Sequence, residues 1–476
     1  MHSTFAGQVV IPPTALATAP RAPDLQRSGA IHSPQRRMAI EAEGQEPYGS
    51  MMDRRSFLVL LTAGCADPAT GLTPQLALGP AAPTPHNPEP VVDLTSSGSP
   101  SFDAWLRSFY IKAVRAGLPS DLLDRELAGL TPNDRISALD SRQPEFSRPV
   151  SDYIRGVVSD DRVAIGRRRR DALPTLSQIE ARHGVPQNIL VAIWGLESGF
   201  GAILGDFDVI RSMATLAADG RRREFAEDQL MAALKIIGSG EFPRSRLIGS
   251  WAGAMGQTQF IPTTFLATAI DGDGDGRRDL WNSSADALAS AANLLAKAGW
   301  RRGESWHREV IAPEGFDYAL TEGPREIPGW WAERGIRAAD GRPFSTADQQ
   351  APAELIAPSG AAGPLFLAFH NHFMIRRYNN STAYALGVGL LAQRLAGEGQ
   401  LVRDWPQETP LALTDRSDAQ RALAQLGFDP GAPDGIVGVN TRKALRAYQA
   451  SRGLVADGYL SLEMVRRLRG EAAGQP

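Results

Sequence analysis

Apolar residues recur every three or four positions along most of the chain between Phe102 and about Gly399, which is the spacing of one helix face. Gly299 follows one of these stretches and is expected to end that helix. Stretches in which apolar and polar residues alternate are scarce. The pattern therefore predicts a mainly α fold (α+β) with a minor β element. The helical stretches include residues 102–113, 176–179, 189–193, 230–237 and 287–295.

Two stretches without this pattern divide the chain. Residues 66–100 are dense in Pro, Ala, Ser and Gly, which predicts a disordered tether. Residues 401–414 contain two prolines among polar residues and predict a second linker. One large domain is expected at 101–400 and a small domain of three helices at 415–470. Its helices are expected at 419–426, from an Asn440 cap to 448, and near 462–468.

The composition is ordinary for a soluble globular protein, with 476 residues, of which 43% are hydrophobic and 22% charged. The formal net charge of -3 gives no field strong enough to indicate a nucleic-acid partner, so none is expected. The arginine clusters at 167–170 and 221–223 lie among acidic residues and are predicted to be solvated helix faces. We expect a monomer.

Residues 51–65 have the pattern of a secretory signal. Arg54 and Arg55 precede a short apolar stretch, and small residues lead up to Cys65. The apolar stretch is too short to span a bilayer, and the paired arginines resemble the twin-arginine export motif. Because Cys65 is the only cysteine, no intramolecular disulfide can form.

The end of this signal, residues 62–65, resembles a lipoprotein processing box. A periplasmic protein anchored to the membrane through a lipidated Cys65 is therefore expected. Plain secretion is the alternative, because the box departs from the usual pattern at its first residue. Residues 1–50 precede the signal and are expected to be a non-structural upstream segment, with translation starting at Met51 or Met52.

A single carboxylate stands at the end of an apolar helix. Ile189, Ile193 and Glu197 are four residues apart, share one helix face and precede a glycine-rich turn. On such a face, burial and the negative end of the helix dipole both raise the pKa of a carboxyl group. Glycosidic cleavage needs such a protonated acid to protonate the leaving oxygen. Spacing alone slightly favours the alternative, in which Glu197 points into solvent without a catalytic role.

Three blocks around this residue occur in a recognisable order: GLESGFG at 195–201, GSWAGAMGQTQFIP at 249–262 and RYNNSTAYA at 377–385. They resemble the signature blocks of the membrane-bound lytic murein transglycosylase B family, over about residues 100–398. The resemblance implies a lysozyme-like domain with extra lobes around a glycan groove. It also implies cleavage of the β-1,4 bond between N-acetylmuramic acid (MurNAc) and N-acetylglucosamine (GlcNAc) in peptidoglycan, with Glu197 as the catalytic glutamate.

The resemblance further implies a lyase rather than a hydrolase. Ordinary glycosidases use two carboxylates. In this family a single glutamate first protonates the leaving oxygen and then deprotonates the MurNAc 6-hydroxyl, which closes a 1,6-anhydro ring. Two alternatives remain open at this stage: a hydrolytic muramidase, and a non-catalytic peptidoglycan-binding scaffold.

Further site residues follow from matching the family blocks. The resemblance implies that Ser250 and Gln259 hydrogen-bond the substrate acetamido group and the catalytic carboxyl. It also suggests that Tyr378, Asn379 and Tyr384 line the groove, where aromatic rings stack on sugar faces. Ser250 could instead cap a helix, Gln259 could satisfy backbone groups, and either tyrosine could belong to the core.

An acidic loop, DGDGDGRRDLWN at 271–282, has Asp at its first, third and fifth positions and Gly at its sixth, as in an EF-hand calcium loop. Its twelfth residue, Asn282, replaces the usual Glu. The family resemblance implies a loop whose last ligand comes later, and Asp286 suits that role. A structural Ca²⁺ and no organic cofactor are expected; the alternative is an acidic turn without metal. The predicted ligands are Asp271, Asp273, Asp275, the backbone carbonyl of Arg277, and Asp286.

Residues 426–449, LGFDPGAPDGIVGVNTRKALRAYQ, resemble the three-helix peptidoglycan-binding domain. The resemblance implies that this domain raises the local concentration of the enzyme on its polymer. Peptidoglycan glycan strands are therefore the expected partner, and the loop at 434–440 is expected to contact the wall.

Overall fold

The computed structural model describes residues 94–141 and 148–474. The predicted upstream segment, the signal with Cys65 and nearly all of the predicted tether lie outside the described residues. Among the described residues, none of the helices combines the length and the apolar character needed to cross a membrane.

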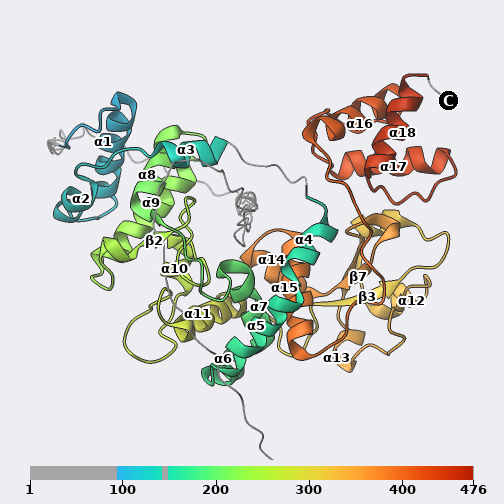
Figure 1. Ribbon diagram of the computed structural model, residues 1–476, viewed down its shortest axis with the longest axis horizontal. Coiled ribbons are helices and arrows are strands. Elements are labelled where there is room, and N and C mark those ends of the chain that lie inside the picture. Colours follow the sequence, from blue (N-terminus) through green and yellow to red (C-terminus); the bar gives the residue numbers. More distant parts are fainter. Residues whose placement is uncertain (1–93, 142–147, 475–476) are drawn as a thin grey trace, which may run out of the picture. The chain divides into compact units, whose positions relative to one another are not determined.

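A lobe of five helices packs together from two separate parts of the chain (Figure 1). The predicted apolar face of its first helix is buried, and the rings of Phe102, Trp105 and Phe109 pack along it. The helices of this lobe are α1 (Pro100–Arg115), α2 (Ser120–Leu127), α3 (Asp134–Ser141), α8 (Val209–Asp219) and α9 (Arg223–Gly238).

A central helical bundle surrounds α7 (Gln187–Ser198), which is apolar on nearly all sides and therefore buried. It packs against α5, α6, α11 and α15. The other helices of the bundle are α4 (Val150–Val157), α5 (Asp160–Asp171), α6 (Thr175–His183), α10 (Pro262–Thr268), α11 (Ser284–Lys297), α14 (His370–Tyr378) and α15 (Thr382–Ala396). Short connecting elements are β1 (Phe207–Asp208), antiparallel to β2 (Ile248–Gly249), and η2 (Arg244–Arg246).

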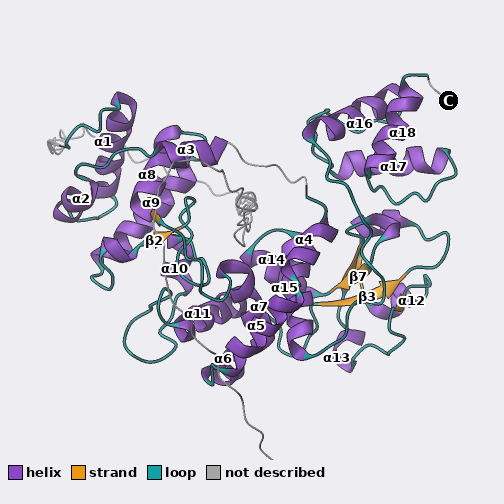
Figure 2. Ribbon diagram, viewed as in Figure 1, coloured by secondary structure: helices purple, strands orange, loops and turns teal. Residues whose placement is uncertain are grey.

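A five-stranded antiparallel sheet forms a third lobe, with strand order β4-β6-β7-β3-β5. Figure 2 shows its strands β3 and β7 in orange. Its core is centred on Trp331, which is fully buried. The strands are β3 (His307–Ile311), β4 (Arg325–Glu326), β5 (Arg337–Ala338), β6 (Ala353–Ile356) and β7 (Leu365–Ala368). The connecting helices are η3 (Tyr318–Glu322), α12 (Pro328–Ala332), α13 (Thr346–Gln349) and η4 (Gly360–Ala362).

The predicted mainly α fold with a minor β element is confirmed, although the strands themselves were not located from the sequence. Every residue of β7 is buried, so its sequence does not alternate between apolar and polar. The remaining strands of this sheet have two to five residues, which is too short for a period of two to be recognised.

The C-terminal module consists of α16 (Leu413–Gln425), α17 (Val439–Ser451) and α18 (Leu462–Ala472) around its own apolar core. All three predicted helices are present, but the first begins six residues before the expected 419. The predicted Asn440 cap is wrong, because α17 begins at Val439 and its N-cap residue is Gly438.

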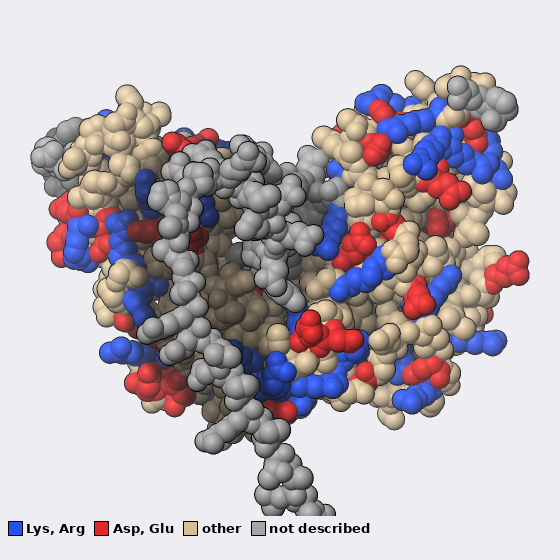
Figure 3. Space-filling view, in the orientation of Figure 1, with Lys and Arg blue, Asp and Glu red and all other residues tan. Residues whose placement is uncertain are grey.

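The arginine clusters are not simply solvated faces, as the sequence suggested. Arg170 donates a hydrogen bond of 2.9 Å to the carbonyl of Leu395 in the last turn of α15, and Arg167 donates to the neighbouring Arg394 carbonyl. Arg221 pairs with the buried Asp140. Guanidinium groups at a helix C-terminus satisfy its last carbonyls, so these cations stabilise the fold. Elsewhere on the face shown in Figure 3, charges of opposite sign are interspersed.

The small module is attached to the sheet lobe by an ion-pair cluster. Arg446 on α17 donates two hydrogen bonds, of 3.0 and 3.1 Å, to the Glu322 carboxylate at the end of η3, and Arg442 pairs with the same group. Burial raises the pKa of Glu322, but the hydrogen bonds from Arg446 and Arg442 outweigh it and hold this pKa below its ordinary value.

Glu322→Gln is expected to loosen this attachment by about 1–3 kcal/mol, because the largely buried Arg446 and the partly exposed Arg442 lose their charged partner. Limited proteolysis of the chain around residues 401–412 would measure the effect, and Glu463→Gln, at an exposed acid on α18, is the matched control. Since the folded-state pKa of Glu322 is lowered, the contribution is present above about pH 4.3 and is lost as pH falls through the lowered pKa. Equal cleavage of both variants would contradict the expectation.

Candidate active site

Glu197 lies in the last turn of α7, and its side chain is buried, with the residue only 5% exposed. The interpretation in which it points freely into solvent is therefore wrong. Gly199 ends the helix in the left-handed region, at φ 59°. Gly195, one turn earlier, lets the Phe200 ring pack closely, since a Cβ there would lie 2.7 Å from that ring.

Tyr384 is the residue that the fold brings directly to this carboxyl. Its hydroxyl donates a hydrogen bond of 2.7 Å to Glu197 Oε1. Tyr384 lies in the first turn of α15, where the Ser381 hydroxyl caps the helix by accepting from the Tyr384 N–H. The packing of α15 against α7 therefore sets the orientation of the carboxyl.

The two predicted groove tyrosines are interior residues. Tyr384 is 1% exposed, and Tyr378 stacks on it with ring centroids 6.4 Å apart. The Tyr378 hydroxyl donates to the Thr258 carbonyl at 2.6 Å. Asn379, at the C-cap of α14, is buried beside them. These rings are too enclosed to stack on a sugar, so their hydroxyls, rather than their faces, shape the site.

The second sequence block folds into a tight loop behind Glu197. Ser250 is buried, and its hydroxyl accepts a hydrogen bond of 3.0 Å from the Ala254 N–H, so it closes a loop rather than capping a helix. The Gln259 side-chain amide donates to the carbonyls of Leu204 and Gly256, at 3.2 and 2.9 Å. This backbone-satisfying role is the alternative that the sequence left open for Gln259.

Backbone strain is concentrated at this loop and at the turn after α7. Among the described residues, the only non-glycine residues with positive φ are Phe200 and Gln259, at 62° and 53°. Such conformations cost energy and persist where the surrounding structure imposes them, often at functional sites. Ser198 ties the two segments together, because its hydroxyl donates to the Gln257 carbonyl at 2.6 Å. The sequence placed Ser198 and Gln257 inside the signature blocks but assigned them no role.

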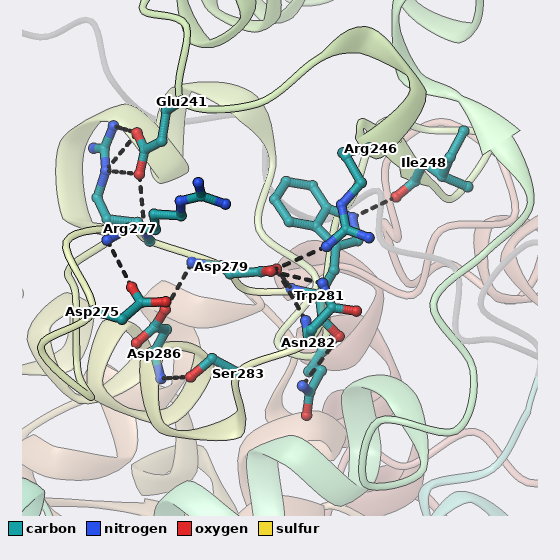
Figure 4. Close-up of polar contacts among 12 residues, drawn as sticks. Glu241, Arg246, Ile248, Asp275, Arg277, Asp279, Trp281, Asn282, Ser283 and Asp286 are labelled. Carbon is teal, nitrogen blue, oxygen red and sulfur yellow. Dashed lines mark hydrogen bonds and ion pairs between the residues drawn. The ribbon is translucent and has the colours of Figure 1, made fainter.

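The predicted acidic loop brings four carboxylates together. One oxygen each from Asp271, Asp273, Asp275 and Asp286 lies within 4.8 Å of the others. Figure 4 shows Asp275 and Asp286 on facing sides of this loop. Asp286 comes from α11 and is fully buried, which raises the pKa of its carboxyl.

Hydrogen bonds shape this loop around the carboxylates. Asp286 accepts backbone N–H groups of Gly272 and Asp279, at 2.8 and 2.7 Å. Asn282 instead donates to Asp279 at 2.7 Å, so it stands outside the cluster, as its departure from the loop pattern indicated. The role of the Arg277 carbonyl stays a prediction. Four clustered oxygen donors are the ligand set that Ca²⁺ prefers.

Comparison with known protein families agrees with this geometry. Residues 101–393, more than half of the chain, match the transglycosylase SLT domain. The chain belongs to this family. Residues 413–468 match a peptidoglycan binding domain, which coincides with the module of α16, α17 and α18. The predicted family and lysozyme-like fold class are confirmed.

Named relatives of this SLT-domain chain come from two bacteria. It is 31% identical to membrane-bound lytic murein transglycosylase B of Escherichia coli K12 over 228 residues, which are 48% of this chain and 60% of that relative. The crystal structure of SltB3 from Pseudomonas aeruginosa in complex with NAG-anhNAM-pentapeptide is 47% identical, with a TM-score of 0.74, and covers 78% of this chain and 100% of that one. The Escherichia coli lytic transglycosylase Slt35 in complex with calcium is 26% identical, with a TM-score of 0.52. This match covers 62% of the present chain and 93% of the Slt35 chain.

Proposed function

We propose that this SLT-domain chain is a lytic murein transglycosylase. It cleaves the MurNAc-β-1,4-GlcNAc bond of peptidoglycan without water and leaves 1,6-anhydro-MurNAc ends. The observation that carries the proposal is the buried Glu197 held by the Tyr384 hydroxyl. It is supported by the relatives' names and by SltB3, whose bound NAG-anhNAM-pentapeptide contains an anhydro sugar.

Glu197 serves in turn as acid and base. Its proton passes to the glycosidic oxygen as the bond to MurNAc C1 breaks, and GlcNAc departs as an alcohol. The MurNAc 6-hydroxyl then bonds to C1 and returns its proton to Glu197, so that no water is consumed. Burial disfavours the ionised carboxylate and keeps bulk water away from the reacting centre. Ser250, Gln259 and Asn379 are proposed to position the substrate around this carboxyl.

Digestion of purified sacculi tests the proposed reaction. Muropeptides released by the full-length protein are expected to carry anhydro ends, which weigh one water less than the reducing ends left by a hydrolytic muramidase. Mass spectrometry of the products separates the two reactions. If all released products carried reducing ends, the protein would be a hydrolytic muramidase and not a transglycosylase.

The four-carboxylate cluster is proposed to hold a structural Ca²⁺ through Asp271, Asp273, Asp275 and Asp286, with the Arg277 carbonyl as a further ligand. The relative Slt35 was solved with calcium. The ion would neutralise carboxylates that repel one another and would close residues 271–282 onto α11, without taking part in the reaction.

Calcium is therefore expected to stabilise the protein. At a concentration one hundred times its Kd, the ion should add about 2.7 kcal/mol to the free energy of unfolding. Thermal unfolding with Ca²⁺ or with a chelator measures this effect, and Asp273→Asn should abolish it. Asp121→Asn, at an exposed acid on α2, should respond to Ca²⁺ like the unchanged protein. If the thermal unfolding midpoint did not change with Ca²⁺, the loop would be an acidic turn that binds no metal.

The protein is also proposed to act in the periplasm as a monomer, anchored through a lipidated Cys65. The signal-like residues 51–65 and the membrane-bound relative support this location. The C-terminal module is proposed to bind the wall through residues 434–440. Within that loop the Ile436 side chain is exposed, although it is apolar. Labelling with palmitate and loss of labelling in Cys65→Ser would test the anchor.

A further inference from the structure

A cavity of about 1210 Å³ lies at the junction of the central bundle and the sheet lobe. Its lining comes from α4, the start of α5, β3, the turn after β5, the end of α15 and residues 397–407. None of the described active-site residues lines it. Tyr384 lies in the first turn of α15, whereas Arg394 lines the cavity from the last turn. At 1.5 Å per residue, the lining residues Leu390 and Arg394 lie about 9 and 15 Å along α15 from Tyr384.

The walls of this cavity are held in place by specific contacts. The Glu309 carboxylate accepts the N–H groups of Val402 and Arg403, both at 2.8 Å. Arg155 donates to the Pro406 carbonyl at 3.1 Å. Residues 401–407 belong to the predicted linker, and these bonds hold them as one wall of the cavity. Arg308 braces the opposite wall by pairing with Asp340 at 2.7 Å.

Charged groups of both signs line the cavity without a side-chain hydrogen bond. Among the described residues, the guanidinium groups of Arg342 and Arg403 donate no hydrogen bond, and the carboxylates of Glu398 and Asp404 accept none. Other lining cations are already paired, as Arg394 is with Asp160 at 2.7 Å. The cavity therefore offers two cations and two anions whose hydrogen-bonding capacity is unused.

Neutral hydrogen-bonding groups accompany these charges. The amide side chains of Gln393, Gln400 and Gln407 line the cavity and make no hydrogen bond to another described residue. His307 also lines it and is 3% exposed, and its Nδ1 has no partner among the described residues. Amide and imidazole groups pair with the N–H and C=O groups of a peptide backbone. The volume exceeds the roughly 300–1000 Å³ of ordinary small-molecule sites, which leaves room for several amino acids.

We propose that this cavity binds the peptide stem of peptidoglycan, a short zwitterionic peptide, at a site separate from the glycan-cleaving centre. Arg342 and Arg403 receive its carboxylates, Glu398 and Asp404 its ammonium group, and the glutamines its backbone. A ligand of one sign would meet repulsion from half of these groups. The identity of the peptide rests on the proposed function, and SltB3 was solved with a fragment that carries a pentapeptide.

Titration with a sugar-free pentapeptide stem tests the site, because this probe has no glycosidic bond to cleave. Calorimetry with the full-length protein should show saturable binding that weakens as salt is added. Arg342→Ala combined with Arg403→Ala should weaken binding at least tenfold. Arg337→Ala is the matched control, since this exposed arginine on β5 lies outside the lining, and it should bind like the unchanged protein.

A second pair of measurements assigns the ammonium partner. Acetylating the ammonium of the probe should weaken binding to the unchanged protein. The same acetylation should matter much less in Glu398→Gln combined with Asp404→Asn, because the partners are then already absent.

The proposed peptide site would be contradicted if the pentapeptide did not bind, or if the double arginine variant bound it as tightly as the unchanged protein. The proposed function is tested independently with peptide-free glycan strands, which the double arginine variant should cleave at the unchanged rate. If those strands are cleaved and the peptide does not bind, only the peptide site fails. If the strands are not cleaved, the proposed function fails.

Discussion

Glu197→Gln is expected to lower the release of muropeptides from sacculi by about 10³-fold or more, because one group supplies both the acid and the base of the reaction. The amide has nearly the shape of the carboxyl, and its oxygen can still accept the Tyr384 hydroxyl. The folded structure and the binding of sacculi should therefore be preserved. Turnover is measured by mass spectrometry of released products, and binding by co-sedimentation.

The matched control is Glu126→Gln, which changes a similarly buried carboxylate on α2, in the N-terminal helical lobe. Its activity, corrected for the folded fraction, should stay within a few-fold of the unchanged protein. A Glu197→Gln protein that still released muropeptides at the normal rate would exclude Glu197 as the acid. If neither protein released any product, yet both bound sacculi, the chain would be a wall-binding scaffold.

Tyr384→Phe is expected to lower kcat by about 10–100-fold with little change in KM, because a small displacement of a reacting group is costly. The hydroxyl donates directly to Glu197 Oε1 and fixes one oxygen of the carboxyl. The ring itself is retained, so the stacking on Tyr378 and the packing of α15 against α7 should persist. Steady-state kinetics on soluble glycan fragments separates kcat from KM.

Tyr110→Phe provides the comparison for Tyr384→Phe. The Tyr110 hydroxyl also donates to a carboxylate at 2.7 Å, that of Asp124, but between α1 and α2 of the five-helix lobe. Loss of this bond should cost about 1 kcal/mol of stability without changing kcat. Should both tyrosine variants reduce kcat equally, the effect would be one of folding rather than of carboxyl position.

The linker predicted at 401–414 shows what local composition leaves undecided. Pro406 and Pro410 break helices, and the structure indeed has no helix or strand between residues 397 and 412. However, Glu309 and Arg155 hold this segment by its backbone. Irregular backbone and freedom of movement are different properties, and only contacts with distant residues distinguish them.

The sequence by itself determined the mainly α fold, the C-terminal module, the acidic loop and Glu197 as the principal candidate. These features depend on residues close together in the chain, where the helical period, glycine turns and alternating carboxylates leave a direct record. The match of three ordered blocks to a known family added the reaction.

Only the tertiary structure decided how these residues work together. Tyr384 and Glu197 are 187 residues apart, and the packing of α15 against α7 makes them partners. This packing, together with that of α14 against α15, turns both predicted sugar-stacking tyrosines inward. Burial and hydrogen bonding depend on which elements meet in space, and the periodicity of one segment carries no information about the segment that will cover it.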